Sequence, residues 1–310
     1  MKPNTVLLSL LLTAFLAGRC AREVYVDLPE EAAKVVLVGG FEPDSVFKVH
    51  LALSQPVFND DGPGRPGTPE VLVTTNEHFY DRLKMEVLNG DTVWIGKKKA
   101  VAASRYALTV RTEGFPVATA SSMAPPPVAL EPIKIDKADY EVVVLNDKLN
   151  GLRIPLVLTM AVDPLPENPY FAFNIRHETA VYERLPNGEK LFDYDYQENS
   201  GFVTDGRTFA LLNKIPEPVT LIHANYWRDN RKTLYLDVVI PFKPDSELPR
   251  RVFVEWRTLS PEFYHYHLSL SRQGANLPLS DPDALYNNVE NGYGNFSGFS
   301  KVVQTIELPE

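Results

Sequence analysis

The stretch Arg105-Tyr106-Ala107-Leu108-Thr109-Val110-Arg111 sets the fold class of this chain, because its side chains change character at every second position. Successive side chains of a β-strand point to opposite faces, so a period of two indicates a strand with one buried face. Tyr106, Leu108 and Val110 are therefore predicted to face a core.

Further strands surround this one. Residues 46–54 alternate in the same way, and Asn89-Gly90 has the composition of a tight hairpin turn between two short β-rich runs. Short strands recur at intervals of roughly ten residues, which is typical of a β-sandwich. An all-β fold is expected, with an Ig-like β-sandwich over residues 20–124.

The pattern breaks at a Pro-rich stretch, where Pro125-Pro126-Pro127 lacks amide donors and favours an extended backbone. We interpret residues 125–136 as a linker between domains; the alternative is a Pro-rich edge segment within one domain. Residues 137–310 are expected to form a second β-rich domain. Ser260-Pro261-Glu262 has the composition of a helix start. It predicts one amphipathic helix of about 12 residues, with four side chains on one face: Phe263, Tyr266, His267 and Leu270.

Charge and cysteine content limit the classes of function. With 31 Lys and Arg against 40 Asp and Glu, the formal net charge is −9, so nucleic acid is not an expected partner, although a local basic patch is compatible with this balance. The 26 prolines argue against long helical bundles. A single cysteine excludes an intrachain disulfide framework and a zinc site of several thiolates.

The N-terminus has the features of a targeting segment. An apolar run of about 13 residues, too short to span a membrane comfortably, is followed by Leu16-Ala17-Gly18-Arg19 and then by Cys20. This arrangement resembles a bacterial lipoprotein signal, so residues 1–19 are predicted to be a signal peptide and Cys20 the lipidated residue. Arg19 departs from the small residue usual at that position. The alternatives are an ordinary secretory signal and an uncleaved anchor.

Catalytic and metal-binding patterns give no enzyme prediction. His265 and His267 would point about 200° apart on a helix, so they are not expected to share a metal. The chain contains no G-x-S-x-G turn and no phosphate-binding Gly-rich loop. We therefore expect a protein without catalytic residues, metal or cofactor.

Aromatic side chains near the C-terminus are the candidate contacts with a partner or ligand, because exposed aromatic rings stack on sugars and anchor interfaces. The alternative is that these rings cover the end of a sheet. The candidates are Tyr264, Tyr266, Tyr286, Tyr293, Phe296 and Phe299.

Several of these segments together resemble a known family. The order of Cys20, the strand at 35–41, the Ser260-Pro261-Glu262 helix start and the Gly/aromatic segment at 287–299 is similar to the domain-of-unknown-function 4249 lipoproteins of the Bacteroidota. In place of the usual first Gly of the final motif, this chain has Glu290-Asn291. The resemblance extends over nearly the whole chain, and the family offers no established catalytic residues.

The resemblance implies an envelope lipoprotein, often encoded beside a TonB-dependent outer-membrane receptor. We therefore expect a protein anchored at the outer membrane through the lipid on Cys20, acting as a non-enzymatic accessory of a TonB-dependent transporter. The alternatives are a free-standing surface module that binds glycan or protein and, less favoured, a hydrolase.

Overall fold

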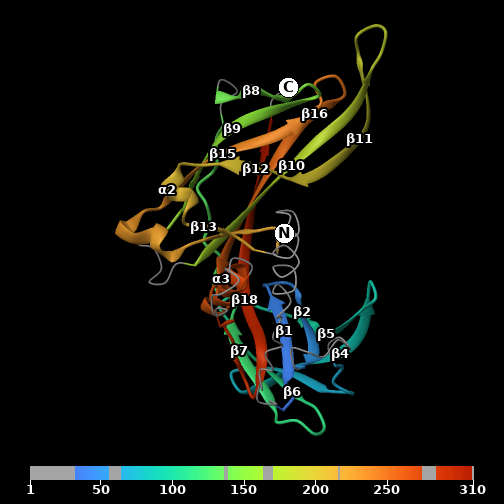
Figure 1. The fold of residues 1–310 in the computed structure, drawn as a ribbon, viewed down its shortest axis with the longest axis vertical. Helices are drawn as coiled ribbons and strands as arrows, with labels where there is room; N and C mark the ends of the chain where they lie inside the picture. The colour runs from blue at the N-terminus through green and yellow to red at the C-terminus, as the bar shows by residue number, and fades with distance from the viewer. Residues whose placement is uncertain are drawn as a thin grey trace, which may run out of the picture. The chain divides into compact units, whose positions relative to one another are not determined.

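A computed structural model describes residues 32–55, 64–135, 139–162, 170–215, 217–273 and 284–308. The predicted signal peptide and Cys20 lie outside these residues. The described chain is mostly β-strand, with one longer helix near the C-terminus, which confirms the predicted fold class (Figure 1).

The first hydrophobic core lies among the N-terminal strands. Tyr106, Leu108 and Val110 are all buried in it, as the alternation predicts. Asn89 and Gly90 both have positive φ and connect β4 to β5, which confirms the predicted hairpin. The strands are β1 (Val35–Phe41), β2 (Val46–Leu53), β3 (Glu70–Thr75), β4 (His78–Leu88), β5 (Asp91–Lys99), β6 (Arg105–Arg111) and β7 (Ala118–Met123).

β4 belongs to both faces of this first sandwich. Its N-terminal half pairs with β3, and its C-terminal half pairs with β5. The hydrogen-bonded path therefore turns from β1-β2-β5 into β3-β6-β7 through a single strand, as strands do at the corners of packed sheets.

The second half of the described chain adds the remaining strands, two α-helices and a 3-10 helix. They are β8 (Glu141–Asn146), β9 (Leu149–Thr159), β10 (Phe171–Arg184), β11 (Lys190–Asn199), β12 (Gly201–Val203), α2 (Gly206–Phe209), β13 (Leu212–Lys214), β14 (Thr220–Ile222), a 3-10 helix (Ala224–Asn230), β15 (Thr233–Phe242), β16 (Glu247–Leu259), α3 (Pro261–Gln273), β17 (Val289–Glu290) and β18 (Gly292–Glu307).

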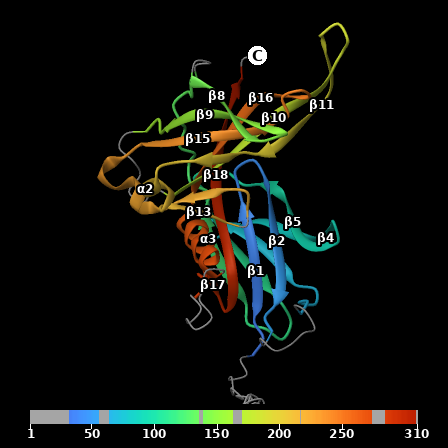
Figure 2. The same ribbon diagram turned by 45° about the horizontal axis from the view of Figure 1, so that its top comes forward.

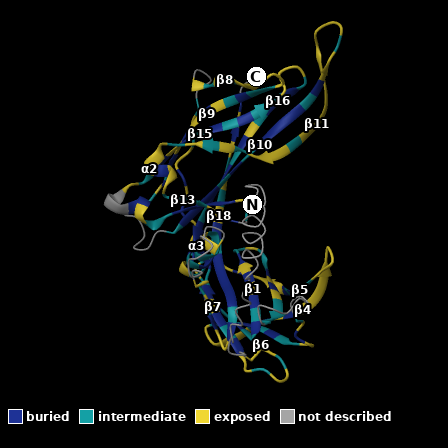
Figure 3. Ribbon diagram, in the orientation of Figure 1, coloured by how far each residue is buried: buried dark blue, intermediate teal, exposed yellow. Residues whose placement is uncertain are grey.

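Two sheets enclose the second core. One has the order β12-β15-β9-β8, and β10, β16 and β18 belong to the other. Inward side chains from both sheets meet in one cluster, in which Ile154, Leu236 and Trp256 are buried. In Figure 3, β10 and β16 are largely dark blue, whereas β11 is almost entirely exposed.

β18 takes part in both cores. Its first residues pair in parallel with β1, from Val35 opposite Gly292, and its later residues pair antiparallel with β16, from Leu259 opposite Phe299. Figure 2 shows β18 beside β1. Phe296 accordingly packs in the first core and Ile306 in the second.

The Pro-rich segment begins after a residue of the first core and itself packs against the second core. Ala124 is buried in the first core, whereas Val128 and Leu130 are buried in the second. The Val128 amide donates to Thr258 Oγ1 at 2.9 Å. The predicted domain boundaries stay a prediction, but the described part of this segment is anchored to the second core through Val128 and Leu130.

Helix α3 begins at Pro261 and ends at Gln273, as predicted. The Phe263 amide donates to Ser260 Oγ at 3.2 Å, which is the expected capping bond. The buried face is wider than the predicted one, because Tyr264 and Leu268 are buried together with Phe263 and Tyr266.

Candidate functional site

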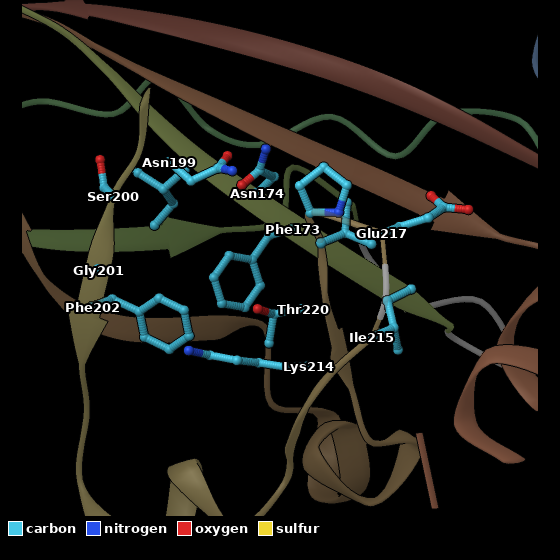
Figure 4. A pocket seen from close by; sticks show the side chains of 13 residues that line it. Phe173, Asn174, Asn199, Ser200, Gly201, Phe202, Lys214, Ile215, Glu217 and Thr220 are labelled. Atoms are coloured by element: carbon cyan, nitrogen blue, oxygen red, sulfur yellow. The ribbon is translucent and has the colours of Figure 1, made fainter. Parts of the chain in front are cut away.

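A cavity of about 310 Å³ lies at the edge of the second sandwich, where β10, β12 and the β13–β14 segment meet. β10 belongs to one sheet and β12 to the other, so the cavity lies where the space between the two sheets reaches the surface. Its volume is at the lower end of the range typical of small-molecule sites. Figure 4 shows the side chains around it.

Two phenylalanines form the apolar wall of this cavity. Phe173 comes from β10 and Phe202 from β12, and their ring centroids are 5.2 Å apart in a tilted arrangement. Phe173 is buried in the second core, while Phe202 is partly exposed. Of these two rings, the partly exposed Phe202 is the one that offers surface to a ligand, with the buried Phe173 ring packed behind it.

Polar groups surround the two rings. Asn174, Asn199 and Thr220 supply amide and hydroxyl groups, and the exposed Lys214 supplies a positive charge. In Figure 4 the Lys214 side chain extends toward the side of the cavity that Phe202 forms. A few polar groups on an apolar wall are the usual composition of a binding pocket.

Ser200 lines the same cavity and is hydrogen-bonded to a buried histidine. Its Oγ lies 3.0 Å from His177 Nδ1, and His177 is fully buried. Burial lowers the pKa of His177 below its usual value, so the ring is neutral at neutral pH. Figure 4 shows the Ser200 hydroxyl pointing away from Phe173 and Phe202. The pair fixes the junction between β11 and β12 rather than presenting the hydroxyl to the two rings.

Glu217 connects the cavity to helix α3. Its carboxylate lies 2.8 Å from Arg257 Nη1 and 3.6 Å from His267 Nε2. Arg257 also pairs with Glu255 at 2.7 Å and covers the Phe299 ring at 4.5 Å. The carboxylate of Glu217 is thus held by two neighbours.

The predicted aromatic contacts are not gathered in one surface cluster. Tyr264, Tyr266 and Phe296 are 2%, 9% and 1% exposed, so the expectation that these three rings are exposed was wrong. The reason is that large rings stabilise the fold most when they are removed from water, and these three occupy inward positions of α3 and β18.

The other predicted aromatic residues have structural partners. Tyr293 accepts a hydrogen bond from Lys34 Nζ at 2.9 Å, Tyr286 lies near His265, and Phe299 packs on Phe263. Their role as contacts stays a prediction.

Sequence reasoning missed the residues that line the cavity. Phe173 lies in the long strand β10, whereas Phe202 and Lys214 lie in strands of three residues, which are too short to show an alternating pattern. No local signal shows which inward residue lies at a sandwich edge, since that depends on pairing between distant strands.

Metal-binding clusters and membrane-spanning helices are both missing from the part of the chain that the structure describes. Among the described residues, no group of three or more His, Cys, Asp or Glu side chains is arranged to hold a metal ion. In that part of the chain no helix combines the length and apolar character needed to cross a membrane.

Fold and site together define an all-β protein with a small cavity at the edge of its second sandwich. Comparison with protein families identifies it further: the chain belongs to the family described as a domain of unknown function (DUF4249), which matches residues 21–305. A search of curated proteins found no match.

Three solved structures show a distant likeness to this chain. A DUF4785 family protein from Legionella pneumophila is 10% identical with a TM-score of 0.23, covering 73% of this chain, and the chain spans about half (53%) of that protein's length. The B domain of a biofilm-associated protein is 8% identical with a TM-score of 0.20, over 87% of this chain and 85% of that one. The BSP domain of a biofilm-associated protein is also 8% identical with a TM-score of 0.20, over 92% of this chain and 61% of that one. TM-scores this low carry no functional information.

Proposed function

We propose that this protein is an outer-membrane lipoprotein, anchored through Cys20, that binds a small ligand as an accessory of a TonB-dependent transporter. It acts by binding, without catalysis. The cavity beside Phe202 is the observation that carries this proposal, because it is a hollow of about 310 Å³ lined by a partly exposed aromatic ring and several polar groups. The signal-like N-terminus and the family resemblance support the anchor and the partner.

Ligand capture follows from the lining of the cavity. The partly exposed Phe202 ring provides an apolar surface on which a flat or saturated ring stacks. The side-chain amides of Asn174 and Asn199 each supply a donor and an acceptor, so they fix the orientation of a polar ligand.

Strand β11 is a better contact surface for the transporter than the buried C-terminal rings. Within the described part of the chain it pairs with β10 alone, and its Leu191, Phe192 and Tyr194 side chains are 56%, 40% and 58% exposed. Exposed apolar side chains on the outer strand of a sheet are a common protein-binding feature.

Co-purification tests this function. The tagged full-length protein is isolated from native outer membranes in mild detergent, and accompanying chains are identified by mass spectrometry. A TonB-dependent receptor is expected to co-purify in near-stoichiometric amount. The double change Leu191→Ser with Tyr194→Ser should reduce the amount of receptor recovered. The matched control is Val87→Ser, because Val87 on β4 is similarly exposed at 66%. Recovery of the lipoprotein alone, in several detergents and after crosslinking, would overturn the proposal.

The second candidate function is a free-standing module that binds glycan. The same cavity supports it, because aromatic rings with neighbouring amide groups are suited to sugar hydroxyls and sugar faces. Glycan-array binding that is lost in Phe202→Ala, without a co-purifying receptor, would favour this candidate.

A further inference from the structure

A groove separate from the cavity described above lies on the outer face of the sheet that contains β12. In β15, Leu234 and Leu236 face the core, so Tyr235 between them points outward and is 64% exposed. Two adjoining hollows of about 420 and 480 Å³ meet there and share Asp205 and Tyr235 as lining residues. They form one groove across the outer face, which we call the Tyr235 groove.

One end of the Tyr235 groove is basic. Among the side chains that the structure describes at this end, Arg207, Arg231 and Lys232 are basic and Asp205 is acidic, which gives them a formal charge of 3 − 1 = +2 in a chain of −9. A local excess of this sign in an acidic protein favours an anionic ligand.

The carboxylate of Asp205 is occupied by hydrogen bonds within its own turn. Asp205 accepts hydrogen bonds from the backbone amides of Arg207 and Thr208 and from the Thr208 hydroxyl. These bonds lower the pKa of Asp205. Arg231 lies over the ring of Tyr226, 4.8 Å from its centroid, which orients the guanidinium without neutralising it.

The other end of the groove is apolar. Val157 lies opposite Tyr235 in the strand register, and Asp237 lies opposite both Pro155 and Val203, so these side chains share one face. Val157 and Val203 are 47% and 56% exposed. The ion pair between Arg153 and Asp237 lies on the same face, with Asp237 between Val203 and Pro155, so the apolar side chains surround a pair of opposite charges that balance each other.

We propose that the Tyr235 groove binds an anionic amphiphile, with the charged head at Arg207 and Arg231 and the apolar chain along Pro155, Val157 and Val203. A simple anion would leave the apolar floor in water, and a neutral lipid would leave the basic end without a partner. Only a ligand with a phosphate or carboxylate head and an aliphatic body satisfies both ends. The chemistry is common to free amphiphiles and to anionic membrane lipids.

Calorimetric titration with octyl phosphate tests this site. The full-length protein is held in nanodiscs of neutral phosphatidylcholine, and empty nanodiscs correct for partition of the probe. Octyl phosphate is expected to bind. Replacing both guanidinium groups, with Arg207→Gln and Arg231→Gln, should weaken binding by about tenfold or more through loss of charge-assisted hydrogen bonds. Val157→Thr, which keeps the side-chain shape and adds a hydroxyl, should weaken it as well.

Two probes and one variant serve as controls. Inorganic phosphate lacks the chain and octyl glucoside lacks the charge, so both should bind at least about tenfold more weakly. Arg184→Gln removes an exposed arginine at the end of β10 and should leave binding unchanged. The proposal is overturned if inorganic phosphate or octyl glucoside binds as tightly as octyl phosphate. It is equally overturned if the double arginine change has no effect while circular dichroism shows a folded protein.

A second experiment distinguishes a membrane lipid from a free amphiphile as the ligand. Nanodiscs that contain phosphatidylglycerol should compete with octyl phosphate if the site takes a lipid head from the membrane that holds the protein. Unchanged octyl phosphate affinity in those nanodiscs assigns the groove to free amphiphiles. Either result supports an anionic amphiphile site and identifies where its ligand comes from.

Discussion

At the scale of single residues, two histidines are held in environments that disfavour their charged form. Burial lowers the pKa of His177, against the opposing influence of Glu198 and Glu247. Burial also lowers the pKa of His267, against the opposing charge of Glu217. Both rings fill positions in packed layers, so protonation at either one costs stability.

The first prediction is a loss of stability in mild acid that depends on His177. Its folded-state pKa lies below the ordinary value of 6.5, so the unfolded chain binds more protons in the window between the two values. Stability is therefore full above about pH 6.5 and falls as the pH decreases below it, by up to about 1.4 kcal/mol per pH unit for one proton. Urea unfolding of wild type and His177→Asn between pH 8 and 5 measures this slope, which should be shallower in the variant.

The matched control for this slope is His50→Asn, because His50 is exposed on β2. Its slope should equal that of wild type. An unchanged slope in His177→Asn would show that His177 does not couple folding to pH.

At the scale of elements, the Gly/aromatic segment that resembles the family motif is explained by the β1–β18 pairing. Gly294 has φ +117°, and a Cβ there would overlap the carbonyl oxygen of Leu37, its partner in the parallel register. Gly298 has a comparable constraint, since a Cβ would lie 2.5 Å from the Met123 carbonyl oxygen. Glycine at these positions lets two backbones approach closely.

The second prediction is that Gly294→Ala destabilises the protein by about 2 kcal/mol or more, through backbone strain and the clash with Leu37. Denaturant unfolding at neutral pH measures the change. Gly40→Ala is the control, because Gly40 lies in β1 and a Cβ there meets nothing within 4 Å. It should change stability by less than about 1 kcal/mol. Equal stability of the two variants would contradict the close approach.

The positions of strands and helices were easier to predict from the sequence than the pairing between distant strands. The alternation at 105–111 and the cap at Ser260 are local, and both gave the right element with nearly the right bounds. Pairing of β1 with β18 joins residues more than 250 positions apart, and no local pattern encodes it. The cavity depends on the same kind of contact, because Phe173, Phe202 and Lys214 come together only when β10, β12 and β13 are placed. The six aromatic candidates were judged by residue type, which does not distinguish an exposed ring from a buried one.

At the scale of the whole molecule, β18 makes the first core depend on the C-terminal end of the chain. Val289 and Phe296 are buried among N-terminal side chains, and Phe296 stacks on Phe41 with centroids 4.8 Å apart. Ser122 Oγ donates to Glu262 Oε2 at 2.8 Å, which ties β7 to the start of α3. The first sandwich is therefore built from both ends of the described sequence.

The third prediction is that residues 33–124 do not fold cooperatively by themselves. Without β18, the β1 edge loses its parallel partner, and the core loses the Phe296 ring that packs on Phe41 and Phe47. Thermal unfolding followed by circular dichroism should show no sharp transition. A matched chain in which residues 286–300 follow residue 124 through a flexible Gly/Ser linker should recover one, because the linker restores the missing strand. A sharp transition in the shorter chain, at the temperature of the linked one, would mean that β18 adds no stability to the first core and that residue 124 is a true domain boundary.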